Sequence, residues 1–181
     1  MLNLKLHGAQ DHIEIFGAPF FLNTDYRVWL DFPEKLDEMI AGRTDLLKRY
    51  FIGEPPPFCQ ETVDEMAKFY YIKPEIPRTA ESDTRLIDYD IDANYIFAAF
   101  LQAYGIDLIE TDLHWHKFQA LIDALPEQTM MTKIMQYRGY NGKSGDYGYS
   151  EYISLKQDWA LPEIYNEEEM EKLDKFNSLF N

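Results

Sequence analysis

The run IDANYIFAAFLQAYG, residues 91–105, constrains the fold more than any other stretch of the chain. Apolar residues fill almost every position in the middle of this run, which is typical of a helix that is buried on nearly all sides. Gly105 follows where a C-terminal cap is expected, and Asp90 or Asp92 can cap the N-terminus. We therefore predict a central buried helix against which the rest of the chain packs.

Shorter segments around this helix predict a mainly α fold. Residues 12–22, HIEIFGAPFFL, alternate polar and apolar side chains before Gly-Ala-Pro, and a short apolar run follows, so we expect a small N-terminal β-hairpin. Asn23-Thr24-Asp25 supplies cap chemistry for the next helix, which Pro33 kinks or divides in two. Further helices are predicted at residues 43–52, 60–72, 111–125, 127–138 and about 150–160, with Pro126 in the first turn of the fourth. The chain has 181 residues, enough for one compact helical domain with its own core.

Two polar stretches interrupt the helical pattern. The run KPEIPRTAESDTR at residues 73–85 has two prolines and little apolar content, which is typical of an exposed linker or mobile loop. The Gly/Tyr-rich stretch 137–152 also predicts a loop. The predicted organisation is an N-terminal hairpin and helices (1–73), the linker (74–85), a core helical region of the same single domain (86–162) and a C-terminal amphipathic helix (163–181).

Acidic residues outnumber basic residues by a wide margin. The chain has 32 Asp and Glu against 17 Lys and Arg, a formal net charge of -15. Such a charge repels phosphate backbones and anionic lipid. We therefore expect no nucleic-acid and no membrane partner. The acidity instead suits solubility, or a partner whose binding segment is basic or amphipathic.

The cysteine content and the absence of long apolar stretches favour a reducing compartment. Cys59 is the single cysteine, which leaves no intramolecular disulfide and no thiolate cluster. The sequence contains no signal-like apolar run and no apolar stretch of about 18 residues. These features predict a protein of the cytoplasm in which it is made.

Two of the four histidines lie in the run LHWHKF, residues 113–118. The flanking pattern predicts a helix. Its apolar face comprises Trp115, Phe118, Leu121, Ile122 and Leu125. On such a helix His114 and His116 would be about 200° apart and could not bind one metal ion. We therefore predict no metal site here, with His114 beside the apolar face and His116 away from it.

Other motifs that suggest chemistry are incomplete. The run Asp88-Tyr-Asp90-Ile-Asp92 begins like a calcium loop, but Ala93 and Ala99 stand where that loop needs Gly and Glu. Gly142-Lys143-Ser144 resembles the end of a phosphate-binding loop, yet Tyr137 stands where its first glycine is required. No nucleophile elbow and no catalytic-thiol signature occur. We therefore predict a non-enzymatic protein without catalytic residues, cofactor or metal.

Two apolar helix faces are candidate partner-binding surfaces. The first, the methionine face, suits varied apolar partners because methionine is flexible, and an ordinary core face is the alternative. The second lies on the predicted C-terminal helix, which either docks on the core or binds another chain. The candidate residues are Met130, Met131, Ile134 and Met135 on the methionine face and Met170, Leu173, Phe176 and Phe180 on the C-terminal helix.

Five stretches together resemble a known family, the bacteriophage gene-product-fifteen family of siphophage tail-region proteins. They are IFGAPFFLNTDYRVWL (15–30), IDYDIDANYIFAAFLQAYGIDLIE (87–110), LHWHKFQALIDALP (113–126), KIMQYR (133–138) and LKQDWALP (155–162). The signature positions in this chain are Asp92, Phe100, Gly105, Trp115, Phe118, Tyr137 and Arg138. At the position of His116 the family pattern usually has a second aromatic residue, so this chain departs from the pattern there.

Members of this family resemble tail-assembly chaperones encoded just upstream of the tape measure protein. The resemblance implies a non-enzymatic chaperone that binds the tape measure protein during tail morphogenesis and recruits the tail tube protein, with self-association left open. It also implies a place in the host bacterial cytoplasm during phage assembly and absence from the mature virion. The alternative is a structural tail or connector component that the virion retains.

Overall fold

The computed structural model describes residues 9–71 and 85–162. These residues belong to two compact units. The first contains the described residues 9–71 and 89–133, and the second contains residues 85–88 and 134–162. The predicted linker, apart from Arg85, and the predicted C-terminal helix with its four candidate residues lie outside the described residues.

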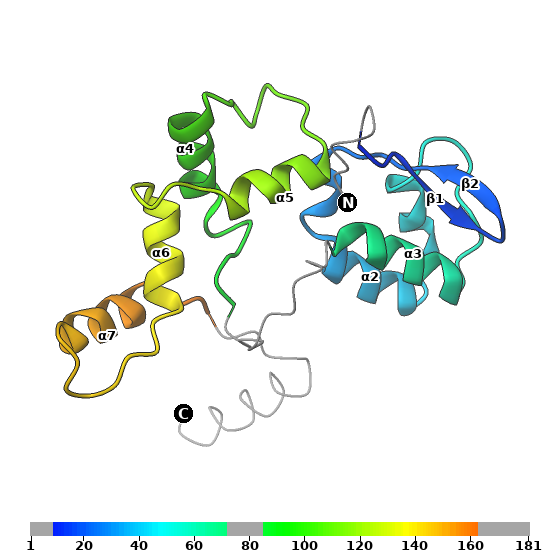
Figure 1. The fold of residues 1–181 in the computed structure, drawn as a ribbon. Coiled ribbons are helices and arrows are strands. Elements are labelled where there is room, and N and C mark those ends of the chain that lie inside the picture. The colour runs from blue at the N-terminus through cyan, green and yellow to red at the C-terminus, as the bar shows by residue number, and fades with distance from the viewer. Residues whose placement is uncertain (1–8, 72–84, 163–181) are drawn as a thin grey trace, which may run out of the picture. The chain divides into compact units, whose positions relative to one another are not determined.

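The prediction of a mainly α fold with a small N-terminal β-hairpin is confirmed (Figure 1). The strands are β1 (His12–Ile15) and β2 (Ala18–Phe21), and the helices are α1 (Tyr26–Trp29), α2 (Phe32–Ile40), the 3-10 helix η1 (Thr44–Arg49), α3 (Gln60–Tyr70), α4 (Ala93–Tyr104), α5 (Trp115–Asp123), α6 (Met130–Arg138) and α7 (Tyr149–Asp158). The division between the units falls within α6, after Lys133. None of the helices in the described parts of the chain is both long and apolar enough to cross a membrane.

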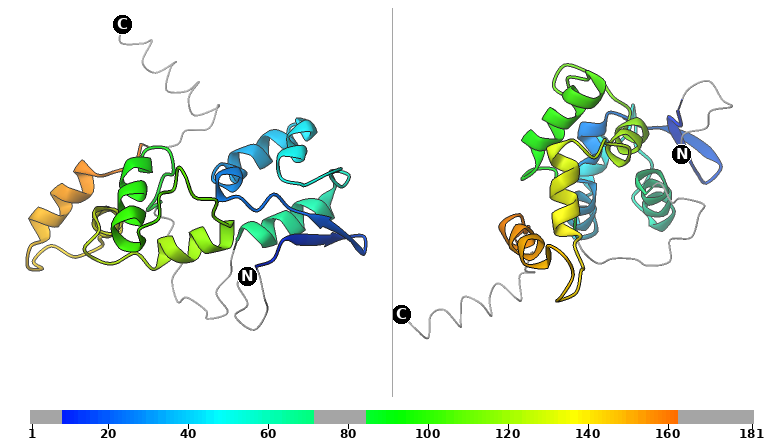
Figure 2. Two further views of the ribbon diagram at one scale, coloured as in Figure 1. Left: turned by 90° about the horizontal axis from the view of Figure 1, so that it is seen from above. Right: turned by 60° about the vertical axis from the view of Figure 1, so that its left-hand side comes forward.

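The hairpin follows from its alternating sequence. β1 and β2 pair antiparallel around a two-residue turn, Phe16 and Gly17, whose φ angles are 52° and 74°. Positive φ at both positions is the turn geometry that matches the twist of two antiparallel strands. Ile13 and Ile15 are buried while Glu14 between them is exposed. The buried side of β1 contacts α3, which runs beside the hairpin in Figures 1 and 2.

The cap and proline signals after the hairpin are also confirmed. Asp25 caps α1, because its carboxylate accepts a hydrogen bond from the Arg27 N–H at 2.9 Å. The chain leaves α1 at Trp29 and starts α2 at Phe32, with Pro33 in the first turn. Proline is tolerated there because the first helical N–H groups have no intrahelical partner.

Aromatic rings build the core of the first unit. One cluster surrounds Trp29, whose ring centroid lies 4.6–5.3 Å from the rings of Phe32, Tyr50 and Phe69. A second cluster surrounds Phe118, which stacks with Tyr26, Phe100 and Trp115 at 4.6, 5.2 and 5.9 Å. Such rings contribute large buried areas and also fix relative orientation. The second cluster joins α1, α4 and α5.

Two details of the helix predictions are wrong. α4 is not buried on nearly all sides, because α5 is the helix that packs against it within the first unit. Ile96, Ala99 and Phe100 are buried, whereas Leu101 is 47% exposed. Pro126 does not lie in the first turn of a helix either, since α6 begins only at Met130.

Thr129 accounts for the late start of α6. Its hydroxyl donates to the carbonyl of Pro126 at 3.0 Å and accepts from the N–H of Thr132 at 3.3 Å. A threonine hydroxyl that accepts from an N–H three residues on is the usual N-cap arrangement. The cap therefore fixes the helix start after Thr129 and leaves Pro126 in the preceding turn.

Candidate functional site

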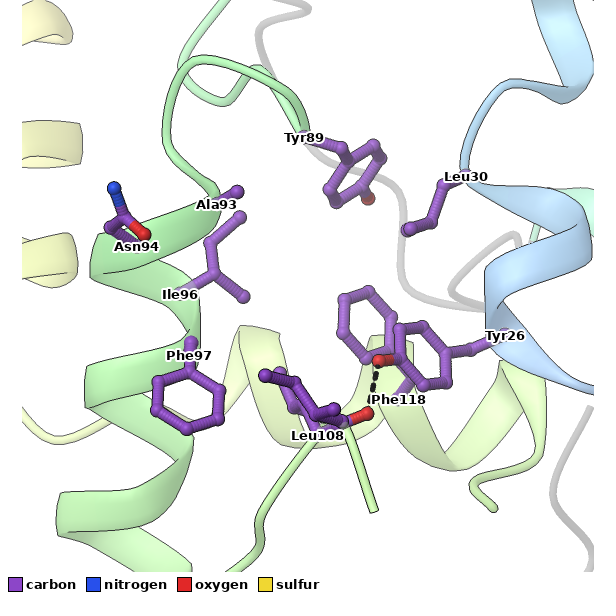
Figure 3. A pocket seen from close by; sticks show the side chains of 10 residues that line it. Tyr26, Leu30, Tyr89, Ala93, Asn94, Ile96, Phe97, Leu108 and Phe118 are labelled. Carbon is purple, nitrogen blue, oxygen red and sulfur yellow. Dashed lines mark hydrogen bonds between the residues drawn. The ribbon is translucent and has the colours of Figure 1, made fainter. Parts of the chain in front are cut away.

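A cavity of about 400 Å³ lies in the first unit between α1, α4, α5 and the loop from α4 to α5 (Figure 3). We call it the aromatic cavity, because Tyr26, Tyr89, Phe97 and Phe118 line it. Its aliphatic lining includes Leu30, Ile96, Leu108 and Ile109. The size lies at the lower end of the roughly 300–1,000 Å³ that is usual for ligand pockets. Ile109, which is 72% exposed, marks the side where the cavity meets solvent.

Tyr26 forms one wall of the aromatic cavity and is held at both ends. Its ring stacks on Phe118 with centroids 4.6 Å apart, and its hydroxyl donates to the carbonyl of Leu108 at 2.8 Å. Burial raises the pKa of Tyr26, so the hydroxyl stays protonated and the bond persists at neutral pH. The Tyr26 hydroxyl is therefore committed to the protein, and only the ring is available to a ligand.

Arg27 fixes the loop that closes the cavity. Its Nη2 donates to the carbonyls of Leu108, Ile109 and Thr111 at 3.0–3.1 Å. Its Nη1 donates to the carboxylate of Asp25 at 2.7 Å. A guanidinium group can serve several acceptors because its donors are held in a fixed planar fork. The same contacts turn the Arg27 charge toward the loop backbone.

Tyr89 lies opposite Tyr26, and its hydroxyl faces the cavity in Figure 3. Its ring centroid is 6.0 Å from that of Phe118. Burial, with a smaller contribution from the carboxylate of Asp123, raises the pKa of Tyr89 to about 12. Within the described residues this hydroxyl makes no hydrogen bond. The hydroxyl of Tyr89 is thus a polar group that the cavity offers to a ligand, and Asn94 is the other lining residue with a polar side chain that is not already hydrogen bonded to the described part of the chain.

Carboxylates surround the aromatic cavity. Asp107 and Asp123 lie near enough to contribute to the raised pKa values of Tyr26 and Tyr89, in which burial is the main cause. Glu110 and Asp112 are exposed on the loop, and the Asp112 side chain is 96% exposed. Arg27, whose side chain is 38% exposed, pairs with Asp25 and Asp112, but the surrounding carboxylates outnumber it, so the field at the mouth of the cavity is negative.

The prediction that the two histidines of LHWHKF point to different sides of one helix is wrong. His116 is fully buried rather than away from the apolar face, and its ring centroid lies 5.0 Å from that of His114. The reason is that His114 is the N-cap of α5, with an extended ψ of 139°, and not a helical residue. The helical rotation of about 100° per residue therefore does not separate the two rings. The described residues hold no group of three or more potential metal ligands.

The same run, together with Gln119 directly after it, caps the C-terminus of α3. His116 Nε2 donates to the carbonyl of Phe69 at 2.8 Å, Trp115 Nε1 donates to the carbonyl of Tyr70 at 3.0 Å, and Gln119 Nε2 donates to that same carbonyl at 3.1 Å. The last carbonyls of a helix have no intrahelical donors, so side chains from elsewhere stabilise the helix end. The polar groups of Trp115, His116 and Gln119 therefore stabilise the end of α3.

Five of the seven signature residues lie in the first unit. Asp92 occupies the N-cap position of α4 and is buried, and Gly105 is its C-cap with a φ of 67°. Phe100, Trp115 and Phe118 are buried in the aromatic core. They position α4 and α5, the two helices that border the aromatic cavity.

The other two signature residues lie in the second unit. Arg138 is buried, and it donates to the carbonyls of Trp159 and Leu86 at 2.7 and 2.9 Å. Tyr137 is half-buried, with its ring 6.3 Å from that of Tyr152 in α7. Arg138 thus joins three segments of this unit through backbone carbonyls.

The methionine face is only partly accessible. Met131 and Ile134 are fully buried, Met135 is half-buried and Met130 is 38% exposed. An ordinary core role accounts for Met131 and Ile134 in this structure. A partner-binding role of the methionine face stays a prediction, and Met170, Leu173, Phe176 and Phe180 lie outside the described residues.

Sequence reasoning missed the aromatic cavity, apart from Phe118. The cavity is built by four segments, which include residues as distant as Tyr26 and Phe118. No local pattern brings such residues together, and each of them read alone suits an ordinary core position. The one available signal was the concentration of acidic side chains around Tyr89 and Leu108.

One comparison with known proteins gives a match. A family model described as "Bacteriophage Gp15 protein" matches residues 9–161. The matched range includes every residue that lines the aromatic cavity and all seven signature residues. None of the curated proteins or solved structures compared with the chain matches it.

Proposed function

Because the chain belongs to the Bacteriophage Gp15 protein family, we propose that it is a tail-assembly chaperone that binds the tape measure protein in the host cytoplasm. This role is non-enzymatic and needs no cofactor. It agrees with the resemblance of the family to proteins encoded beside the tape measure gene. The tail tube protein is the second partner that this role implies.

The aromatic cavity is the observation that carries the proposal. A chaperone for long amphipathic helices needs an apolar site on a protein that itself stays soluble. The cavity provides about 400 Å³ of mainly apolar space, and the net charge of -15 favours solubility. Charge of this sign also attracts basic partner segments and suppresses wrong ones.

Co-expression with the tape measure protein of the same phage tests the proposal. We expect the tape measure protein to be largely insoluble alone and soluble with this chain, and the two to elute together in size-exclusion chromatography. Deletion of the gene should abolish tails of normal length, and a plasmid copy should restore them. If tape measure solubility and tail length are the same with and without the gene, the proposal fails.

A structural component retained in the virion is the second candidate. The observation that favours it is the exposure of Phe16, Phe21 and Ile52, which are 68%, 52% and 68% exposed at and beside the hairpin. Exposed apolar side chains of this kind suit permanent subunit contacts. Mass spectrometry of purified particles separates the candidates, because a structural subunit is present in stoichiometric copies and a chaperone is absent.

A further inference from the structure

We propose that the aromatic cavity receives one aromatic side chain with a hydrogen-bond donor, a tryptophan or a tyrosine, from a basic amphipathic helix of the tape measure protein. The inference rests on the proposed function and names the site and the chemistry of its ligand. Three independent features carry it. They are the rings of the cavity, the hydroxyl of Tyr89 and the charge at the mouth.

The rings favour an aromatic ligand. Tyr26 and Phe118 are stacked at 4.6 Å with an interplanar angle of 12°, and Phe100 also stacks with Phe118, at 5.2 Å. Tyr26 and Phe118 are fully or nearly fully buried, so their orientations are set before a ligand arrives. Aromatic rings gain from offset-stacked and edge-to-face contacts that an aliphatic side chain does not make.

The hydroxyl of Tyr89 favours a ligand with an N–H or O–H group. The Tyr26 hydroxyl already donates to Leu108, whereas the Tyr89 hydroxyl faces the cavity without a hydrogen bond among the described residues. A polar group enclosed by an apolar ligand without a partner costs binding energy. An indole N–H or a phenol O–H can donate to the Tyr89 oxygen, which reduces that cost.

The surrounding charge favours a basic helix. Asp107 and Asp123 lie near the tyrosines of the cavity, and Glu110 and Asp112 are exposed on its loop. The guanidinium of Arg27 is hydrogen bonded to the loop carbonyls and to the carboxylates of Asp25 and Asp112, and its single positive charge is outnumbered by the carboxylates around the cavity. Lysine or arginine residues that flank the inserted ring would therefore meet carboxylates. An acidic helix would be repelled.

Peptide binding to the full-length protein tests the ligand chemistry. The probes are four lysine-rich amphipathic helical peptides that differ at one central position, which is tryptophan, tyrosine, 2-naphthylalanine or leucine. Isothermal titration calorimetry should show the tryptophan and tyrosine peptides binding about tenfold more tightly than the leucine peptide. Replacement of the lysines by glutamate should abolish binding, and added salt should weaken it. Equal affinity of the tryptophan and leucine peptides overturns the inference.

Two substitutions on α4 test the location. Ala93 lines the aromatic cavity and Ala98 does not, and both are exposed. Ala93→Phe places a ring in the cavity and should weaken binding of the tryptophan peptide about tenfold. Ala98→Phe should change the affinity for this peptide by less than about twofold. Circular dichroism checks that both variants fold. If the two variants bind the peptide equally well, the cavity is not the site.

Tyr89→Phe tests the polar contact without changing the shape of the ring. The unsubstituted protein should prefer the tryptophan peptide to the 2-naphthylalanine peptide, which has a similar ring system but no N–H. Tyr89→Phe should lose this preference. Because Tyr89→Phe adds no ring to the cavity, this comparison tests the site even if Ala93→Phe fails to fold. A preference that survives the substitution overturns the assigned role of Tyr89.

Co-expression of the tape measure protein with Ala93→Phe separates this inference from the proposed function. If the unsubstituted chain and Ala98→Phe keep the tape measure protein soluble and Ala93→Phe does not, the inference is supported. If all three keep it soluble, the cavity inference fails while the chaperone function stands. If the unsubstituted chain does not solubilise it, the proposed function itself fails.

Discussion

The imidazole of His116 donates Nε2–H to the backbone carbonyl of Phe69 at 2.8 Å, and the two rings lie 4.4 Å apart. One polar and one apolar contact therefore join the start of α5 to the end of α3. The position is fully buried, and burial lowers the pKa of His116 to about 4. The imidazole is therefore neutral at neutral pH, and its protonation at lower pH favours the unfolded state.

Because His116 is buried, the free energy of unfolding should decrease as the pH falls. The unfolded chain binds a proton with a pKa of 6.5, whereas the folded chain resists protonation until the pKa of about 4. Protons therefore favour the unfolded state in this window, and the free energy of unfolding should fall by about 2 kcal/mol between pH 7 and pH 5 from this group. Urea denaturation at both pH values measures the loss, which His116→Phe should remove.

The comparison needs a control, because other groups also titrate in this range. Burial lowers the pKa of His114 as well, so part of the pH dependence should remain in His116→Phe. His12→Phe changes an exposed histidine that pairs with Asp11 and leaves the buried His116 in place, so the loss of stability assigned to His116 should remain in this variant. If His116→Phe and His12→Phe lose the same stability between pH 7 and pH 5, the assigned effect of burial is wrong.

Arg27→Lys should destabilise the first unit by about 1–3 kcal/mol, since an ammonium group cannot serve three loop carbonyls and a carboxylate at once. Arg43→Lys is the matched control. Arg43 is 58% exposed and makes surface ion pairs with Glu38 and Asp45, both at 3.4 Å, so its replacement should matter by less than about 0.5 kcal/mol. Thermal unfolding measures both. Equal shifts for the two variants would contradict the role given to Arg27.

Gly105 should tolerate asparagine better than valine. Its φ of 67° lies in the left-handed region, and a Cβ added there meets nothing within 4 Å. The cost of substitution is therefore backbone strain alone, which asparagine bears more easily than a β-branched residue. We expect Gly105→Val to lower the free energy of unfolding by about 1–2 kcal/mol, and Gly105→Asn by clearly less. A similar loss for both in urea denaturation would argue for a steric cause.

Phe16→Asn should stabilise the protein. Phe16 has a φ of 52° and its side chain is 68% exposed, so the turn bears left-handed strain while little packing is lost on substitution. Asparagine before glycine is the favoured sequence for this turn, and the expected gain is about 0.5–1 kcal/mol. Phe21→Asn, at a 52% exposed position in β2, serves as the control and should give no gain. A loss of stability in Phe16→Asn would show that the exposed ring packs more than its exposure indicates.

Local patterns were enough to predict most elements of the fold. The hairpin followed from the alternation of Ile13 and Ile15, the break between α1 and α2 followed from Pro33, and the end of α4 followed from Gly105. Each of these signals acts through the backbone within a few residues. Predictions from such signals therefore do not depend on the tertiary contacts that the segment makes.

Predictions that depended on tertiary contacts failed or were absent. Periodicity placed His116 away from the core, because it treated His114 as helical, whereas His114 caps α5 and turns the run inward. The apolar content of α4 predicted burial on nearly all sides. In the structure, however, Leu101 is exposed, and Ile96 and Phe97 line the aromatic cavity. A cavity is defined by what neighbouring elements fail to fill, and no single segment encodes that.

The capping of α3 by Trp115, His116 and Gln119 has a consequence for synthesis on the ribosome. Residues 9–71 contain a hairpin and three α-helices, but the donors for the last carbonyls of α3 come 45 to 49 residues later. At about 5–20 residues per second, the nascent chain waits roughly 2–10 seconds for them. During that interval the ring of Phe69 lacks its cover from His116. The first half of the chain should therefore complete its fold only after the second half has begun to emerge, and it should be the part of the newborn protein most dependent on host chaperones.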